Sequence, residues 1–281
     1  MTNKSLDFSQ RHIGLDSGDV SKILDELGFD SLDAFFTSLV PESIYDLKNL
    51  NLPAALDEAS ALKSLKEISK KNKVFKSYIG NGFYNCNVPA VIKRNVFENP
   101  GWYTSYTPYQ PEIAQGRLEA LMNYQTMVAD LTAMDISNAS LLDEPTAAAE
   151  SMMLAHRVSK SKSNNFFIHE DTLHQTISII KSRAKPLGID IEVGDKPDDN
   201  KDYFGCYLQY PSANGSVEDF SKLADSIHSK DGLLVVGTDL LALTVLKPPG
   251  EFGADIVVGS SQRFGVPMGF GGPHAGFMAV K

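Results

Sequence analysis

The 281-residue sequence has little of what would indicate a disulfide framework, a membrane span or a nucleic-acid partner. Its two cysteines, Cys86 and Cys206, are too few for a disulfide scaffold, so we expect a reducing compartment, the cytoplasm. Its apolar runs are too short for a transmembrane helix, and its net charge of −9 argues against nucleic-acid or anionic-membrane partners. No Cys/His spacing typical of a metal site occurs. The N-terminus lacks an apolar core and is not rich in arginine, which predicts no signal or transit peptide.

Residues 1 to about 72 have the apolar spacing of helices. Val20, Ile23, Leu24 and Leu27 form one stripe that ends at Gly28, and similar stripes follow before Pro41 and up to residue 70. We interpret these stripes as packing surfaces of a helical core. The polar run at residues 70–73 predicts a boundary, which gives a helical segment at 1–72 and a larger domain at 73–281.

The larger domain alternates short apolar segments with helical ones. We expect strands at 166–168, 189–193, 203–210, 233–236, 255–259 and 276–280, and helices at 173–183 and 217–229. This alternation predicts an α/β fold whose mainly parallel sheet is covered on both faces. The sequence ends directly after an expected strand, which predicts an incomplete domain.

A proline-rich loop at residues 103–111 precedes the alternating region. Pro108 and Pro111 restrict the residue before each of them to extended geometry, so this loop is not expected to be helical. The side chains of this loop and of the next residue are therefore presented on a restricted backbone: Tyr106, Tyr109, Gln110 and Glu112. The alternative is that the tyrosines pack against the following helix, expected at 113–131, and find backbone partners there.

An alanine-rich helix is expected from Ala147 to Lys160, with Asp143 as its N-cap and Pro145 in its first turn. The free N–H groups at such a helix end can bind an anion. A capped, buried helix without a ligand is the commoner arrangement, and the spacing alone favours it.

Several blocks of the sequence, in the same order, resemble the N-terminal half of the glycine cleavage system P-protein family, glycine dehydrogenase (decarboxylating). The longest are YTPYQPEIAQGRLEALMNYQTMVADLTAMD at 106–135 and NASLLDEPTAAAE at 138–150. Shorter ones are QRHIG at 10–14, YIGNGFY at 78–84, NPGWY at 99–103, PPGEFGAD at 248–255 and QRFG at 262–265. The resemblance covers nearly the whole chain.

The resemblance implies an aminotransferase-like fold of pyridoxal-phosphate enzymes (fold type I), here as an incomplete large domain. It implies that the complete enzyme decarboxylates glycine with pyridoxal phosphate and passes the aminomethyl group to the lipoyl arm of H-protein. The implied partners are lipoylated H-protein and a C-terminal catalytic half, fused or separate, in a dimer of halves or a homodimer. The alternative is a non-catalytic structural half that only stabilises the catalytic one.

The cofactor lysine of that family is absent from its expected place. The family's cofactor-binding half has His-Lys-Thr-Phe where this chain reads Gln262-Arg263-Phe264. Arginine stays charged and offers no free amine for a Schiff base. We therefore expect the lysine to lie outside this chain, no catalytic residue within it, and no activity of the chain alone.

Two more positions depart from the family pattern. The carboxylate that would pair with the pyridinium nitrogen falls on Val236, with Asp239 three residues further on. The family's His-Pro-Gln-Thr is replaced by Leu173-His174-Gln175-Thr176, which displaces the histidine. Whether Asp239 or His174 contacts a ligand stays open, and the residues expected to line the active site are Tyr106, Tyr109, Gln110 and Glu112.

Overall fold

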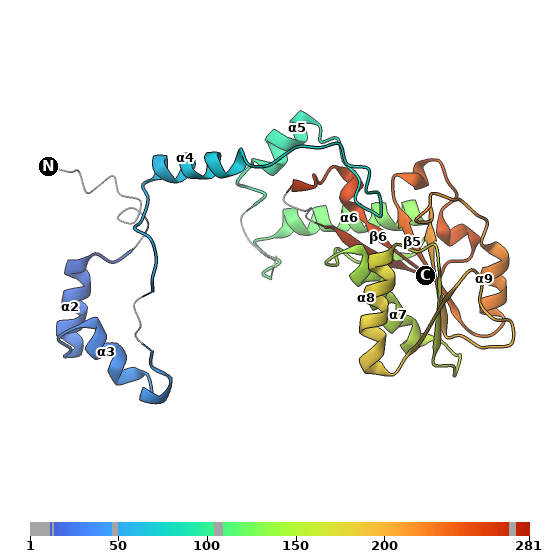
Figure 1. The fold of residues 1–281 in the computed structure, drawn as a ribbon, viewed down its shortest axis with the longest axis horizontal. Helices are drawn as coiled ribbons and strands as arrows, with labels where there is room; N and C mark the ends of the chain where they lie inside the picture. The colour runs from blue at the N-terminus through green and yellow to red at the C-terminus, as the bar shows by residue number, and fades with distance from the viewer. Residues whose placement is uncertain (1–11, 13, 47–49, 104–108, 270–273) are drawn as a thin grey trace. The chain divides into compact units, whose positions relative to one another are not determined.

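The computed structural model describes residues 12, 14–46, 50–103, 109–269 and 274–281. They fall into two compact units, Met1–Lys76 and Ser77–Lys281 (Figure 1). The border between the units lies close to the break expected at residues 70–73. The second unit contains the β-sheet.

The first unit contains three described α-helices and a 3₁₀ turn: α2 (Ser17–Leu27), α3 (Leu32–Leu39), η2 (Glu42–Ile44) and α4 (Glu58–Ser69). Each α-helix follows a polar residue whose side chain accepts a hydrogen bond from a backbone N–H of the first turn. These N-caps are Asp16, Ser31 and Asp57. Gly28 ends α2 with a φ of 77°, a conformation that glycine adopts without steric cost.

The apolar stripes of these helices are largely exposed, so the expectation of core packing is wrong for the described residues of this unit. Leu24 is the one buried residue of α2, and α3 and α4 bury none. Leu39 is 62% exposed, and Leu62 of α4 is 69% exposed. Helical spacing identifies residues that share a face, but it does not show whether another element covers that face.

The second unit is built on a seven-stranded sheet. Its strands lie in the order β1-β7-β6-β5-β4-β2-β3. Their bounds are β1 (Ile136–Ser137), β2 (Asn165–His169), β3 (Asp190–Gly194), β4 (Gly205–Tyr210), β5 (Leu233–Asp239), β6 (Ile256–Ser260) and β7 (Gly276–Val280). From β3 to β6 the pairing is parallel, and β7 runs antiparallel to both of its neighbours.

Helices connect and cover these strands. The α-helices are α5 (Ala90–Ile92), α6 (Gln115–Thr132), α7 (Glu144–Val158), α8 (His174–Ala184) and α9 (Ser221–His228). A π-helical segment, η3 (Lys93–Phe97), continues α5. Short 3₁₀ turns complete the connections: η4 (Lys185–Leu187), η5 (Ala242–Thr244), η6 (Pro249–Phe252) and η7 (Ser261–Phe264).

Apolar clusters cover both faces of the sheet. One cluster joins residues of α6 and α9 to Leu208 and Val236, and the other joins α7 and α8 to Tyr207 and Val235. Consecutive strand residues thus contribute to opposite faces, as the pleat of a strand requires. Figure 1 shows α8 and α9 on opposite sides of the strands. The predicted α/β fold with a mainly parallel, doubly covered sheet is confirmed.

The edge strand β1 was not expected from the sequence, whereas its neighbour β7 coincides with the strand expected at 276–280. β1 is only two residues long, too short to show any alternation. It pairs with β7, which lies about 140 residues later in the chain. The backbone N–H of Asn138 donates to the carbonyl of Met278, whose own N–H donates to Oδ1 of Asn138 at 3.0 Å.

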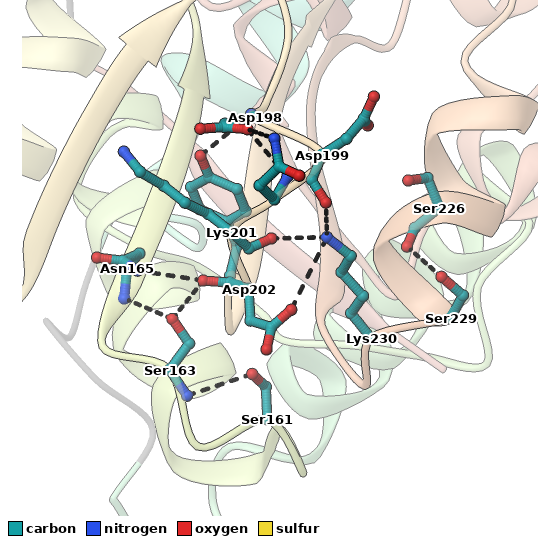
Figure 2. A network of polar contacts seen from close by, with 12 residues as sticks. Ser161, Ser163, Asn165, Asp198, Asp199, Lys201, Asp202, Ser226, Ser229 and Lys230 are labelled. Carbon is teal, nitrogen blue, oxygen red and sulfur yellow. Dashed lines mark hydrogen bonds and ion pairs between the residues drawn. The ribbon is translucent and has the colours of Figure 1, made fainter.

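A polar network ties together the loops at the amino ends of the parallel strands (Figure 2). The Lys230 ammonium donates to the carbonyl oxygens of Asp199 at 2.6 Å and Lys201 at 2.7 Å, and lies 3.8 Å from the Asp202 carboxylate. Ser163, just before β2, donates to the Asp202 carbonyl. One ammonium therefore holds the segment that leads into β4 against the turn that leads into β5.

Candidate functional site

The candidate site is a cleft at the carboxyl ends of β4, β5 and β6, the place where open parallel sheets bind ligands. Its volume is about 260 Å³. The following residues line it: Gly82, Tyr84, Glu144, Leu173, Gln209, Pro211, Ser212, Ala213, Asn214, Gly215, Thr238, Asp239, Ser260, Gln262 and Arg263. The network around Lys230 lies at the other end of the strands, so the two polar clusters are separate.

The N-terminus of α7 supplies one wall of the cleft. Asp143 caps this helix by accepting the N–H of Thr146 at 2.7 Å, as expected from the sequence. The next residue, Glu144, is partly buried in the cleft wall and accepts a hydrogen bond from Nε2 of Gln209 at 3.0 Å. Burial raises the pKa of the Glu144 carboxyl to about 7, and the nearby Asp239 and Asp143 carboxylates act in the same direction. The carboxyl groups of Asp143 and Glu144 therefore lie at the N-terminus of α7, the position at which a helix without them would attract an anion.

A buried chain of hydrogen bonds continues from Glu144 into the sheet. The Tyr207 hydroxyl donates to Oε1 of Gln209 at 3.2 Å, and Gln209 in turn donates to Glu144. The neighbouring position on β5 is Gly237, where an added Cβ would stand 2.0 Å from the Tyr207 hydroxyl. Glycine is therefore required at this position for the tyrosine to reach Gln209.

The floor of the cleft holds an ion pair between two strand ends. Nε of Arg263, in η7 after β6, lies 3.4 Å from Oδ2 of Asp239, the last residue of β5. The guanidinium also lies over the ring of Tyr84, 5.1 Å from its centroid, and Nη1 donates to the carbonyl of Asn85 at 3.4 Å. Arg263 and Asp239 are each about three-quarters buried, which strengthens their attraction relative to a surface pair.

Three buried polar atoms of the cleft lack a hydrogen-bond partner among the described residues. They are Oγ1 of Thr238, Nε2 of Gln262 and Nε of Arg263, whose 3.4 Å approach to Asp239 lacks hydrogen-bond alignment. Thr238 is 1% exposed and Gln262 is 3% exposed. Each unpartnered buried group costs roughly 1–3 kcal/mol.

A strap of residues 80–86 lies along the cleft. Nε2 of Gln175 in α8 donates to the Asn81 carbonyl, and the Cys86 thiol donates to the Gln262 carbonyl at 3.1 Å. With the contacts of Arg263 to Tyr84 and Asn85, these bonds attach the strap to α8 and to η7. The strap thus contributes Gly82 and Tyr84 to the lining.

Of the four residues expected to line an active site, the three that the structure describes do not line this cleft. Tyr106 lies outside the described residues. Tyr109 is 78% exposed, Gln110 and Glu112 are also exposed, and none of the three lines the cleft. Their role as active-site lining stays a prediction.

Asp239 and His174, whose contact with a ligand the sequence left undecided, lie in different places in the structure. Asp239 lies in the cleft, paired with Arg263, whereas His174 is an exposed first residue of α8 outside the lining. Sequence reasoning missed Glu144, Gln209 and Thr238. Gln209 and Thr238 stand near the carboxyl ends of apolar strands, and that position was the signal that could have identified them.

The described part of the chain gives no support for a metal site or for a membrane-spanning helix. No group of three or more metal-ligating side chains occurs there. No helix within the described ranges has the length and apolar character needed to cross a membrane.

The strand order, the reversed β7 and the cleft at the carboxyl ends of the strands define the class: the aminotransferase-like α/β fold of pyridoxal-phosphate enzymes, fold type I. Residues 10–281 match the family model of the glycine cleavage system P-protein, and the chain belongs to that family.

The relatives are close in sequence and much longer. The chain is 55% identical over 276 residues to glycine dehydrogenase (decarboxylating) of a Nostoc species, and 56% identical over 278 residues to that of Paraburkholderia xenovorans. Both alignments cover 98% of this chain and 28% of the relative. The crystal structure of a glycine decarboxylase (P-protein) in inhibitor-bound form superposes with a TM-score of 0.86 and 33% identity, over 95% of this chain and 62% of that one.

The cleft does not fit the cofactor that this fold class implies. None of the described residues that line it is a lysine, and Arg263 at the expected place has no free amine to offer. Asp239 is paired with Arg263 rather than free for a pyridinium nitrogen. Asp143 and Glu144 at the start of α7 would repel a phosphate group there. Pyridoxal phosphate is therefore not assigned to this cleft.

Proposed function

We propose that this chain is the N-terminal part of a glycine dehydrogenase (decarboxylating). The complete protein decarboxylates glycine with pyridoxal phosphate and passes the aminomethyl group to the lipoyl arm of H-protein. Family membership over residues 10–281 supports this proposal, as do relatives that bear this name at 54–56% identity. The chain spans under a third of those relatives, so the activity is proposed for the complete protein.

The ion pair between Arg263 and Asp239 is the observation that supports placing the cofactor in another part of the complete protein. The Arg263 guanidinium occupies the place where the family's other half has its cofactor lysine, and it is paired with Asp239, three residues after the position expected for the carboxylate partner. The cofactor lysine of the complete protein is therefore proposed to lie outside residues 1–281, in a C-terminal catalytic half that is fused or a separate subunit. The two halves form a dimer of halves, or the fused protein forms a homodimer.

The loop residues Tyr106, Tyr109, Gln110 and Glu112 are proposed to line the shared active site. The described members of this set are exposed on this chain, which leaves their polar groups available to another surface. The prolines around them limit the entropy that these side chains would lose on docking. The same exposure is compatible with a purely structural role, in which this half only stabilises the catalytic half.

A cytoplasmic location is part of the proposal. Both cysteines of the chain are free thiols, which suits a reducing compartment.

Borohydride reduction tests the proposed position of the cofactor. The complete protein is reduced in the presence of pyridoxal phosphate, digested, and searched for the pyridoxyl-lysine peptide by mass spectrometry. We expect one stoichiometric adduct, on a lysine outside residues 1–281. A stoichiometric adduct on a single lysine within these residues would contradict the proposal.

A further inference from the structure

The cleft retains hydrogen-bond donors that no described residue uses. The Thr238 hydroxyl and Nε2 of Gln262 are buried without a hydrogen-bond partner, and Nε of Arg263 makes no hydrogen bond although it is ion-paired with Asp239. They come from the end of β5 and from the turn after β6, and all three residues line the same space. Donors left free in a buried site are satisfied by a ligand that carries acceptor oxygens.

The charges of the cleft exclude most oxyanions. Arg263 is the one cationic side chain among the described residues of the lining, whereas Asp239 and Glu144 both carry carboxyl groups, and Asp143 lies close enough to Glu144 to act on its charge. A phosphate dianion would meet more repulsion than attraction here. A ligand with one carboxylate and one ammonium group complements Arg263 with its carboxylate and the carboxyl groups of Asp239 and Glu144 with its ammonium group.

The volume limits the size of the ligand. Sites for drug-sized molecules are about 300–1,000 Å³, and this cleft has about 260 Å³. Most of the lining side chains are polar, including Ser212 and Asn214 of the loop after β4. A small, polar molecule fits these walls better than a large apolar one.

We propose that the cleft binds a small α-amino acid as a zwitterion, with its carboxylate toward Arg263, Gln262 and Thr238 and its ammonium toward Glu144 and Asp239. This proposal does not depend on the function proposed above, because it rests on the side chains of this cleft alone.

Equilibrium dialysis with labelled glycine tests the proposal on the complete protein. Borohydride reduction beforehand fixes the cofactor to its lysine, so that glycine cannot enter by exchange there. We expect saturable glycine binding that Arg263→Gln and Thr238→Val each weaken at least tenfold. Thr238→Val keeps the side-chain shape and leaves the Arg263–Asp239 pair intact, so it remains informative if Arg263→Gln fails to fold.

Matched controls decide what is recognised. Arg183→Gln removes an exposed arginine of α8 and should leave glycine binding unchanged. Acetate and methylamine carry one charge each and should compete at least tenfold less well than unlabelled glycine. The proposal is overturned if the wild-type protein binds no glycine, if both cleft substitutions leave binding unchanged, or if acetate competes as well as glycine. Decarboxylation is measured on unreduced enzyme, so lost activity with retained dialysis binding refutes only the proposed function.

Discussion

Replacing Glu144 by glutamine should change how the stability of this chain depends on pH. Burial, with smaller contributions from the Asp239 and Asp143 carboxylates, raises the pKa of the Glu144 carboxyl from its ordinary value of 4.5 to about 7. The hydrogen bond from Gln209 opposes this rise by favouring the charged form. Glutamine keeps the size of the side chain and removes its charge.

The sign of the effect follows from the raised pKa. Because the folded chain holds this proton more tightly than the unfolded chain, the contribution of Glu144 to stability is fully present below pH 4.5. It is lost as the pH rises to about 7. A tenfold difference in proton affinity is worth about 1.4 kcal/mol, so the upper bound on this contribution is about 3 kcal/mol. Partial exposure of Glu144 to solvent reduces it, and we expect about 1–2 kcal/mol.

Urea denaturation of wild-type and Glu144→Gln chains at pH 5, 6, 7 and 8 measures this difference. The free energy of unfolding of the variant relative to wild type should rise by about 1–2 kcal/mol from pH 5 to pH 8. Glu119→Gln, at an exposed position of α6, controls for the loss of one negative charge from the chain. A relative stability of Glu144→Gln that is constant or falls over this range would refute the reasoning.

Other substitutions test separate parts of the structure. In the complete enzyme, Tyr109→Phe and Glu112→Gln should each lower glycine decarboxylation about tenfold, equivalent to ~1.4 kcal/mol in the barrier, with little change in Tm. Unchanged activity with a lower Tm would instead favour the structural-half alternative. Lys230→Met should destabilise the chain to urea by about 1–3 kcal/mol because two carbonyls lose their donor. Lys222→Met, at an exposed position of α9, is the control, and equal effects of the two substitutions would contradict a stabilising role of the Lys230 network. Asp143→Ala should lower the free energy of unfolding by about 1 kcal/mol through loss of the α7 cap. Asp143→Asn should retain most of that stability, because asparagine can also cap a helix.

Much of the fold of the second unit could be predicted from the sequence because burial leaves a local pattern. The segments at 166–168 and 203–210 are strands β2 and β4, and the cap at Asp143 opens α7. The pattern could not reveal β1, because two residues carry no periodicity and their pairing depends on β7. It also could not show that the stripes of α2 and α4 are exposed, since a stripe does not identify what faces it.

The candidate site was only partly predictable for a similar reason. Arg263 stood out because its chemistry is incompatible with the role that the resemblance assigns to its position. Its pairing with Asp239 joins two strand ends and could be seen only in three dimensions. Glu144 has the sequence context of an ordinary residue in the first turn of a helix. Its raised pKa arises from burial and from the proximity of Asp239, which belongs to another element.

The pairing of β1 with β7 has a consequence for how the chain folds as it is synthesised. β1 precedes its partner by about 140 residues, which a ribosome working at about 5–20 residues per second needs roughly 7 to 28 s to make. During this time the strands from β2 to β6 emerge in an order that lets each parallel pair form with a strand already made. The edge of β6 stays open until β7 arrives. From Ser260 to Val280 the chain grows by about 20 residues, which takes roughly 1–4 s at that rate. For that time the nascent domain exposes an unpaired strand edge, for which a chaperone, or a neighbouring nascent chain, can compete.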